Sequence, residues 1–307
     1  MRPALLLLLL AGVCTADPKI DNVLMRMVPP GSISLVGAHM DAIRQTDLYQ
    51  RMLAERKLPD VDRFASETGF DPRRDVRELL YVTAPGETNV MVARGTFRPN
   101  LSSMRDLTLV RHGEYNIFVT TDGKAAERKA GFCILDSTLA AAGDLAGIEA
   151  ALDEWKSGSH TGAQPLLARV HAASPGAQLW GVSTGVAGFL ADYMPRANNG
   201  IDFSRILRGL EDTWFEADFA AGLRASVHGR TQTDQDAVNL RDAAKGLIGL
   251  GRLSVPENQP ELVRVWDGIA VTQDGRNLLV SANIPENLMD KLVAMFSPAP
   301  GRGRSVR

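Results

Sequence analysis

The spacing of apolar residues alternates between two periods along the chain. Short runs in which apolar and polar residues alternate predict strands with one buried face, and apolar residues that recur every three or four positions predict amphipathic helices. Strands of the first half are predicted at 32–38, 77–84, 88–97, 115–121, 131–136 and 138–143, and helices at 40–55, 61–68, 101–112 and 145–156.

The second half repeats this order of elements. Gly37 and Gly181 each end the opening strand of their half, and "GFDPRR" from Gly69 matches "GIDFSR" from Gly200. Such correspondences indicate a divergent duplication. Strands of the second half are predicted at 177–182, 213–222, 223–231, 267–273 and 277–284, and helices at 184–194, 202–210, 234–251 and 285–296.

Strands joined mainly by hairpins, with helices inserted between the hairpins, are typical of an α+β fold. We therefore expect two divergent copies of a largely antiparallel sheet with helices packed on one face. The segment "SGSHTGAQP" is rich in Gly, Ser and Thr and marks the boundary between the copies. The predicted division is a signal peptide at 1–16, a first copy at 27–156, a linker at 157–175, a second copy at 176–297 and a disordered tail at 298–307.

The first residues have the features of an export signal. Arg2 precedes the apolar run "ALLLLLLAGV", and Cys14-Thr15-Ala16 places small residues at a signal peptidase site. The run is about half of the ~20 residues that cross a bilayer, so we expect cleavage after Ala16 and a periplasmic or extracellular chain without a transmembrane segment. Cys14 leaves a lipoprotein as the alternative, which the branched Val13 before it disfavours.

Charge and cysteine content argue against a nucleic-acid-binding protein and against a fold held by disulfides. The chain has 34 Lys and Arg against 36 Asp and Glu, a formal charge of −2 that becomes −3 when Arg2 leaves with the leader. This balance lacks the basic footprint of a nucleic-acid-binding protein. Without Cys14 only Cys133 remains, so no internal disulfide forms, and its apolar surroundings predict a buried small hydrophobe.

One motif suggests chemistry. Gly181-Val182-Ser183-Thr184-Gly185 satisfies G-x-S-x-G, the nucleophile elbow of serine hydrolases, between a predicted strand and a predicted helix. A nucleophilic Ser183 needs a histidine that takes its proton, and His228 is the only histidine downstream. The competing interpretation is a structural junction, in which Ser183 or Thr184 caps the following helix, because Ser183 does not recur at the matching position of the first half.

The remaining polar residues form no complete site. His39 and Asp41 could supply two metal ligands, but no neighbouring histidine or cysteine completes a set, so no metal and no cofactor are predicted. His112, His160 and His171 fall at predicted helix ends or in the linker, where surface or capping roles are expected.

The stretches "FASETGFDPRRDVRELLYV", "NVMVARGTF" and "DQDAVNLRDAAKGLIGLG" resemble segments of uncharacterised exported bacterial proteins with tandem α+β halves. The resemblance spans most of the mature chain. It implies secretion and a duplicated fold, and it carries no catalytic residue.

We expect an exported, non-enzymatic protein of the cell envelope that works by binding or as a scaffold. Its partner is expected to be a protein, an envelope component or a small apolar ligand. A protease inhibitor or chaperone-like domain differs from this only in its partner. The alternative from another class is a periplasmic serine hydrolase that uses Ser183 with His228.

Overall fold

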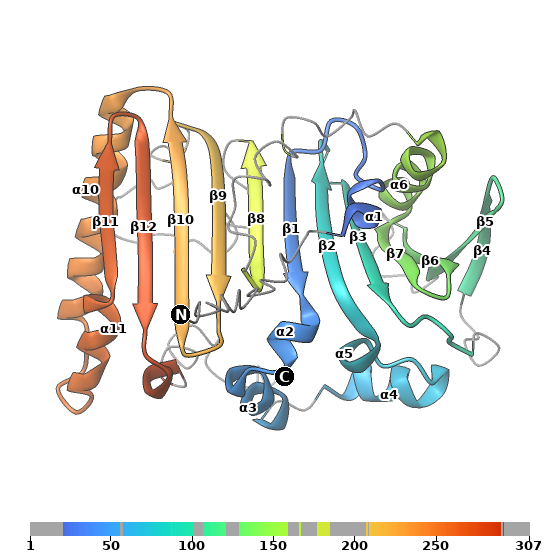
Figure 1. The fold of residues 1–307 in the computed structure, drawn as a ribbon, viewed down its shortest axis with the longest axis horizontal. Coiled ribbons are helices and arrows are strands. Elements are labelled where there is room, and N and C mark those ends of the chain that lie inside the picture. The colour runs from blue at the N-terminus through green and yellow to red at the C-terminus, as the bar shows by residue number, and fades with distance from the viewer. Residues whose placement is uncertain are drawn as a thin grey trace, which may run out of the picture.

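The computed structural model describes residues 21–55, 58–86, 88–100, 107–120, 129–158, 166, 177–184, 207, 209–289 and 291 (Figure 1). These residues form an α+β fold around one antiparallel sheet of twelve strands, in the order β11-β12-β10-β9-β8-β1-β2-β3-β7-β6-β5-β4. The strands are β1 (Ser34–His39), β2 (Val76–Ala84), β3 (Thr88–Gly95), β4 (Leu107–His112), β5 (Tyr115–Thr120), β6 (Ala130–Asp136), β7 (Leu139–Asp144), β8 (Leu179–Thr184), β9 (Leu210–Asp218), β10 (Leu223–Thr231), β11 (Ile269–Asp274) and β12 (Asn277–Ile284).

The helices have the end signals that the sequence carries. Asp71 and Thr233 accept backbone N–H groups at the starts of their helices, and Gly69 ends another with a φ of 75°. Within the described residues, no helix is both long and apolar enough to cross a membrane. The helices are α1 (Asn22–Met25), α2 (Met40–Arg44), α3 (Asp47–Glu55), α4 (Pro59–Thr68), α5 (Pro72–Asp75), α6 (Leu145–Ser157), α10 (Asp234–Leu253) and α11 (Val263–Asp267), with 3-10 turns η2 (Pro260–Leu262) and η3 (Glu286–Leu288).

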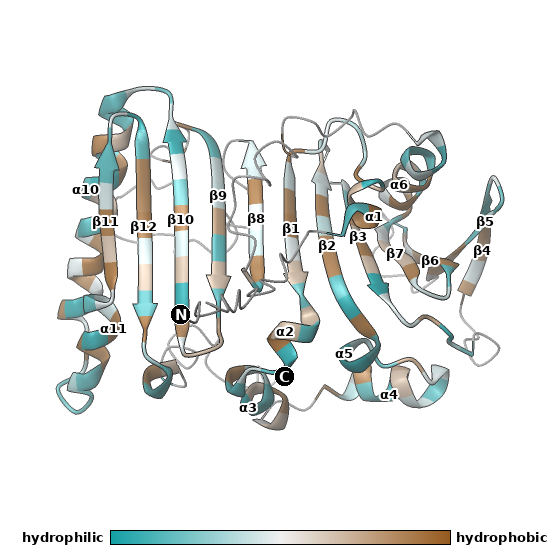
Figure 2. Ribbon diagram, viewed as in Figure 1, coloured by the Kyte–Doolittle hydropathy of each residue, from teal (hydrophilic) through white to brown (hydrophobic). Residues whose placement is uncertain are grey.

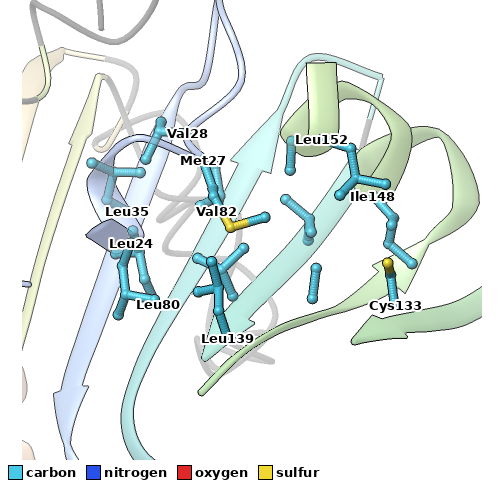
Figure 3. Packing of buried hydrophobic residues seen from close by; sticks show 14 of the residues in the cluster. Leu24, Met27, Val28, Leu35, Leu80, Val82, Cys133, Leu139, Ile148 and Leu152 are labelled. Carbon is cyan, nitrogen blue, oxygen red and sulfur yellow. The ribbon is translucent and has the colours of Figure 1, made fainter. Parts of the chain in front are cut away.

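The largest core lies where α1 and α6 cover the sheet (Figure 3). Leu80, Val92, Ala141 and Cys133 are register partners on successive strands, so their side chains share one face, here named the α6 face. Ile148 of α6 is fully buried against the same cluster. The predicted burial of Cys133 is thus confirmed.

Helix α10 packs on the opposite face of the sheet, which corrects the prediction that all helices share one face. Val280 of β12 packs against the cluster beneath α10. Residues paired across neighbouring strands share a face of the sheet, and successive pairs on β10, β9 and β8 connect Val280 to Val36. The next residue, Gly37, is the partner of Leu80 on the α6 face. Since successive residues of a strand point to opposite sides, Val36 and Val280 lie on what we name the α10 face.

Both predicted copies contribute strands to one continuous sheet, with β1 and β8 paired at its centre. Figure 2 shows mostly apolar residues along β1 and β12, whereas β10 carries several polar residues. The expected leader, most of the linker, the helix at 184–194, most of the helix at 202–210 and the tail lie outside the described residues. The domain limits stay predictions.

Three local predictions were wrong. The segment 107–112, predicted as part of a helix, is strand β4, because its apolar residues pair with β5 at the sheet edge. The helix predicted at 40–55 is interrupted at Gln45 and Thr46, where the Thr46 hydroxyl accepts the N–H of Tyr49 and starts a new helix. Gly37 and Gly181 lie inside their strands and do not end them.

The two glycines make room for aromatic rings of neighbouring strands. A Cβ on Gly37 would collide with the indole of Trp180, and one on Gly181 would collide with the ring of Phe215. Gly37 faces the α6 side and Gly181 the α10 side, since Gly37 pairs with Trp180 and Gly181 with Phe215. Close packing against an aromatic ring therefore explains both glycines.

Candidate functional site

The structure does not bring Ser183 and His228 together. Ser183 pairs with Thr213, whereas His228 pairs with Trp214, the next residue of the same strand. Adjacent residues of a strand point to opposite faces, so the sheet separates the Ser183 hydroxyl from the imidazole. Ser183 is buried inside strand β8, and its hydroxyl donates to the carbonyl of Thr184 at 3.3 Å. The helix that it was expected to cap lies outside the described residues.

His228 belongs to a different cluster on the α6 face. Its ring stacks on Trp214 with centroids 3.3 Å apart, and its Nε2 lies 3.2 Å from the Ser226 hydroxyl. Ser226 in turn donates to a carboxylate oxygen of Glu216 at 3.2 Å. Burial lowers the pKa of His228, although the charge of Glu216 acts in the opposite direction. The cluster orders neighbouring strands through side-chain contacts.

The other histidines also have structural surroundings. His39 ends β1, where burial lowers its pKa, and Asp41 pairs with Arg44 at 2.6 Å. His112 reaches from the end of β4 to Asp153 of α6, with 2.7 Å between Nε2 and Oδ1. No group of three metal-binding side chains occurs in the part of the chain that the structure describes. His160 and His171 lie outside it.

The strongest candidate site is an apolar hollow of about 520 Å³ on the α10 face of the first half. Its floor is formed by residues on the α10 face of β2, β3, β6 and β7, which include Leu79, Met91 and Phe132. Its walls come from the segment 40–73, with Met40, Tyr49, Phe64, Phe70 and Pro72, and from Phe97 and Pro99 after β3.

Side-chain size explains why space remains beneath these helices. Strand β7 contributes only alanines to the lining, Ala140, Ala141 and Ala142, between the larger residues of β3 and β6. The wall is held by aromatic contacts, with the Phe70 ring 6.2 Å from Phe64 and 5.4 Å from Phe97 between centroids. Met91 keeps 37% of its surface exposed on the floor of the hollow. An aliphatic or aromatic ligand therefore meets apolar groups on both sides.

Charged groups around the hollow mostly neutralise one another. The guanidinium of Arg73 pairs with Asp71 at 2.9 Å and with Asp62 of α4 at 2.7 Å. The Arg73 side chain holds the pKa of Asp71 below its ordinary value through this hydrogen bond. Arg44 donates to the backbone carbonyl of Val76 at 2.6 Å and ties α2 to the start of β2. This network positions the wall and neutralises the charge of Arg73.

A second cavity of about 590 Å³ adjoins the hollow. The two cavities share Phe97, Pro99 and Ile134 in their linings. Unlike the hollow, the second cavity includes exposed polar residues, namely Arg98, Glu114 and Asn116. An apolar and a polar compartment thus meet beside the segment 97–99.

No motif in the sequence pointed to these residues as a binding site. A usable signal was the run Leu79-Leu80-Tyr81-Val82, which is apolar at successive positions where a half-exposed strand alternates. Continuous apolar runs indicate strands with both faces covered. The lining residues come from segments spread over 40–142, so their assembly depends on the tertiary structure.

Comparisons with known proteins leave the family open. No family model matches the chain, and a comparison with curated proteins gives no match. Among solved structures, the chain is similar to one described as "Structure of crystal form I of TP0453", with 8% identity, a TM-score of 0.47, and coverage of 89% of this chain and 98% of that chain.

Proposed function

We propose that the protein is an exported, non-enzymatic binding protein of the cell envelope that holds an apolar ligand in the hollow. The main support for this proposal is a cavity of about 520 Å³ whose lining is almost wholly aliphatic and aromatic. Pockets that bind small molecules have volumes of about 300–1,000 Å³ and mainly apolar walls. Export itself rests on the leader at 1–16.

The driving force for binding is the removal of apolar surface from water. Each buried methylene contributes about 0.8 kcal/mol, so affinity should rise about fourfold for each methylene added to a linear ligand until the hollow is full. The neutralised charge of Arg73 favours an uncharged segment in contact with the wall. A hydrocarbon chain or an aromatic group fits this chemistry.

The serine hydrolase alternative receives no support from the geometry. Ser183 and His228 project from opposite faces of the sheet, and the hydroxyl that His228 does contact is that of Ser226. Catalysis by Ser183 would need a base within hydrogen-bond reach. Binding in the hollow therefore fits the geometry better than hydrolysis by Ser183.

We also propose that the two halves arose by duplication. From the central pair outward, β1-β2-β3 and β8-β9-β10 are successive antiparallel strands in the same order. An equivalent hairpin, β6-β7 or β11-β12, follows at each side. The motifs "GFDPRR" and "GIDFSR" support the same origin.

Binding of the neutral apolar dye N-phenyl-1-naphthylamine tests the proposed function. In Met91→Asp a carboxylate without a partner stands on the floor of the hollow, which should weaken dye binding by about tenfold or more. Val227→Asp is the matched control, because Val227 lies on the same sheet face in the other half and is 39% exposed against 37% for Met91.

Unfolding curves of both variants show whether the fold is retained. Saturable dye binding that Met91→Asp weakens and Val227→Asp leaves unchanged supports the proposal. Equal effects of the two substitutions, or no saturable binding to the wild type, would overturn it. A measured turnover that depends on Ser183 would also overturn it.

A further inference from the structure

The second cavity has two exposed side chains of opposite charge in its lining, beside the hollow. Arg98 and Glu114 are both exposed in the lining of this cavity. Neither forms a hydrogen bond or an ion pair among the residues that the structure describes. This distinguishes Arg98 from Arg73, the arginine of the hollow, which two aspartates neutralise.

The backbone holds Arg98 at the junction of the two cavities. Phe97 donates its N–H to the carbonyl of Ser137 at 2.8 Å, and Asn100 donates to the carbonyl of Thr68 at 2.8 Å. Arg98 lies between these anchors, and its neighbours Phe97 and Pro99 line both cavities. A ligand whose apolar part fills the hollow can therefore extend past Phe97 and Pro99 to Arg98.

Glu114 approaches the same cavity from the β4–β5 turn. It follows Gly113, whose φ of 60° shapes this turn, and it precedes Tyr115, which also lines the cavity. The ring of Tyr115 packs against the core on the α6 face, so the group of this turn that faces a ligand in the cavity is the Glu114 carboxylate, which suits a cationic group. An anionic group suits Arg98, whose guanidinium can donate two parallel hydrogen bonds.

We propose that the ligand is an amphiphile with a zwitterionic head, whose hydrocarbon chain fills the hollow and whose head lies in the second cavity. The anionic group of the head binds Arg98, and its cationic group lies beside Glu114. This assignment rests on the proposed function, because the chain must first bind in the hollow. It is more specific, since a purely apolar ligand would leave both charges unused.

Three probes with ten-carbon chains, the carboxyl carbon of decanoate included, test the head group, each kept below its micelle-forming concentration. They are decylphosphocholine, which is zwitterionic, decanoate, which is anionic, and decyl maltoside, which is neutral. Titration calorimetry on the mature chain gives the three dissociation constants. Exposed ion pairs contribute about 0–1 kcal/mol, so we expect decylphosphocholine to bind about two- to fivefold more tightly than decyl maltoside.

Two variants should shift the affinities in opposite directions. Arg98→Gln should abolish the preference for decylphosphocholine and weaken decanoate binding, whereas Glu114→Gln should strengthen decanoate binding by about two- to fivefold. Arg252→Gln is the control, because Arg252 is an exposed arginine on α10 in the other half of the sheet. It should leave all three constants unchanged.

The possible failures are distinguishable. Equal affinities for the three probes, or a ratio that neither Arg98→Gln nor Glu114→Gln changes, would overturn the head-group assignment while the apolar site stands. Binding of none of the three probes would overturn the proposed function itself. A decyl maltoside affinity that Arg98→Gln changes as much as the decylphosphocholine affinity would show that the substitution damages the cavity and would refute a charge-specific role.

Discussion

Substitution of Gly37 by alanine tests whether the central glycines exist to admit aromatic rings. The three ring atoms of Trp180 nearest to an added Cβ would all lie within 3.0 Å of it. Trp180 is 3% exposed and belongs to the main core, so its ring has little freedom to move aside. One methyl group at Gly37 therefore requires a displacement of the indole or of strand β8.

The expected magnitude follows from two opposing effects. Overpacking a core by one methyl group costs about 1–3 kcal/mol. Alanine in place of glycine recovers about 0.5–1 kcal/mol, because the unfolded chain loses freedom. We expect Gly37→Ala to lower the free energy of unfolding by about 0.5–2 kcal/mol. Gly246→Ala on α10 should raise it by about 0.5–1 kcal/mol, since nothing lies within 4 Å of the added Cβ.

Urea unfolding followed by circular dichroism measures both changes. The double variant Gly37→Ala with Trp180→Leu removes the ring that the methyl group meets, so its loss should be smaller than the sum of the two single losses by about 0.5 kcal/mol or more. If Gly37→Ala were as stabilising as Gly246→Ala, or if the two substitutions in the double variant were additive, the packing explanation would be refuted.

Three further predictions concern single groups. Hydrogen bonds from arginines are the first cause that lowers the pKa of Asp71 and that of Asp75. The two carboxylates therefore stabilise the folded state above their ordinary pKa of 3.8, and this contribution is lost as the pH falls through the lower folded value. Unfolding measured over a range of acidic pH should show this loss of stability, and Asp71→Asn should make it smaller. Burial raises the pKa of Cys133 to about 11, so a thiol reagent at about pH 8 should label Cys133 only after unfolding, and rapid labelling of Cys133 in the native protein would contradict this. A fluorophosphonate probe should leave Ser183 unlabelled, whereas labelling that disappears in Ser183→Ala would restore the hydrolase alternative.

Local patterns located most elements correctly. The hairpin of β2 and β3 turns at Pro85-Gly86, and that of β11 and β12 turns at Asp274-Gly275, as these turn residues predict. The error at 107–112 has a physical cause. An apolar spacing over few residues fits a helix and a strand equally, and pairing with β5 decided between them.

For the candidate site, local sequence patterns predicted little and the tertiary structure decided most. The G-x-S-x-G match described neighbours along the chain, but the register put Ser183 and His228 on opposite faces of the sheet. A shift of one residue in pairing would have reversed that outcome, and sequence contains no direct measure of register. Arg98 and Glu114 gave no signal, because single exposed charges occur throughout the chain.

The sequence by itself determined the types of most elements, their turns and the antiparallel character of the sheet, because these depend on contacts between residues close along the chain. The tertiary structure decided that both halves share one sheet, that α6 and α10 cover opposite faces, and that small residues on β7 leave a hollow beneath the helices of the first half. Those features depend on strand register and on the packing of side chains distant in sequence, whose energies no local pattern records.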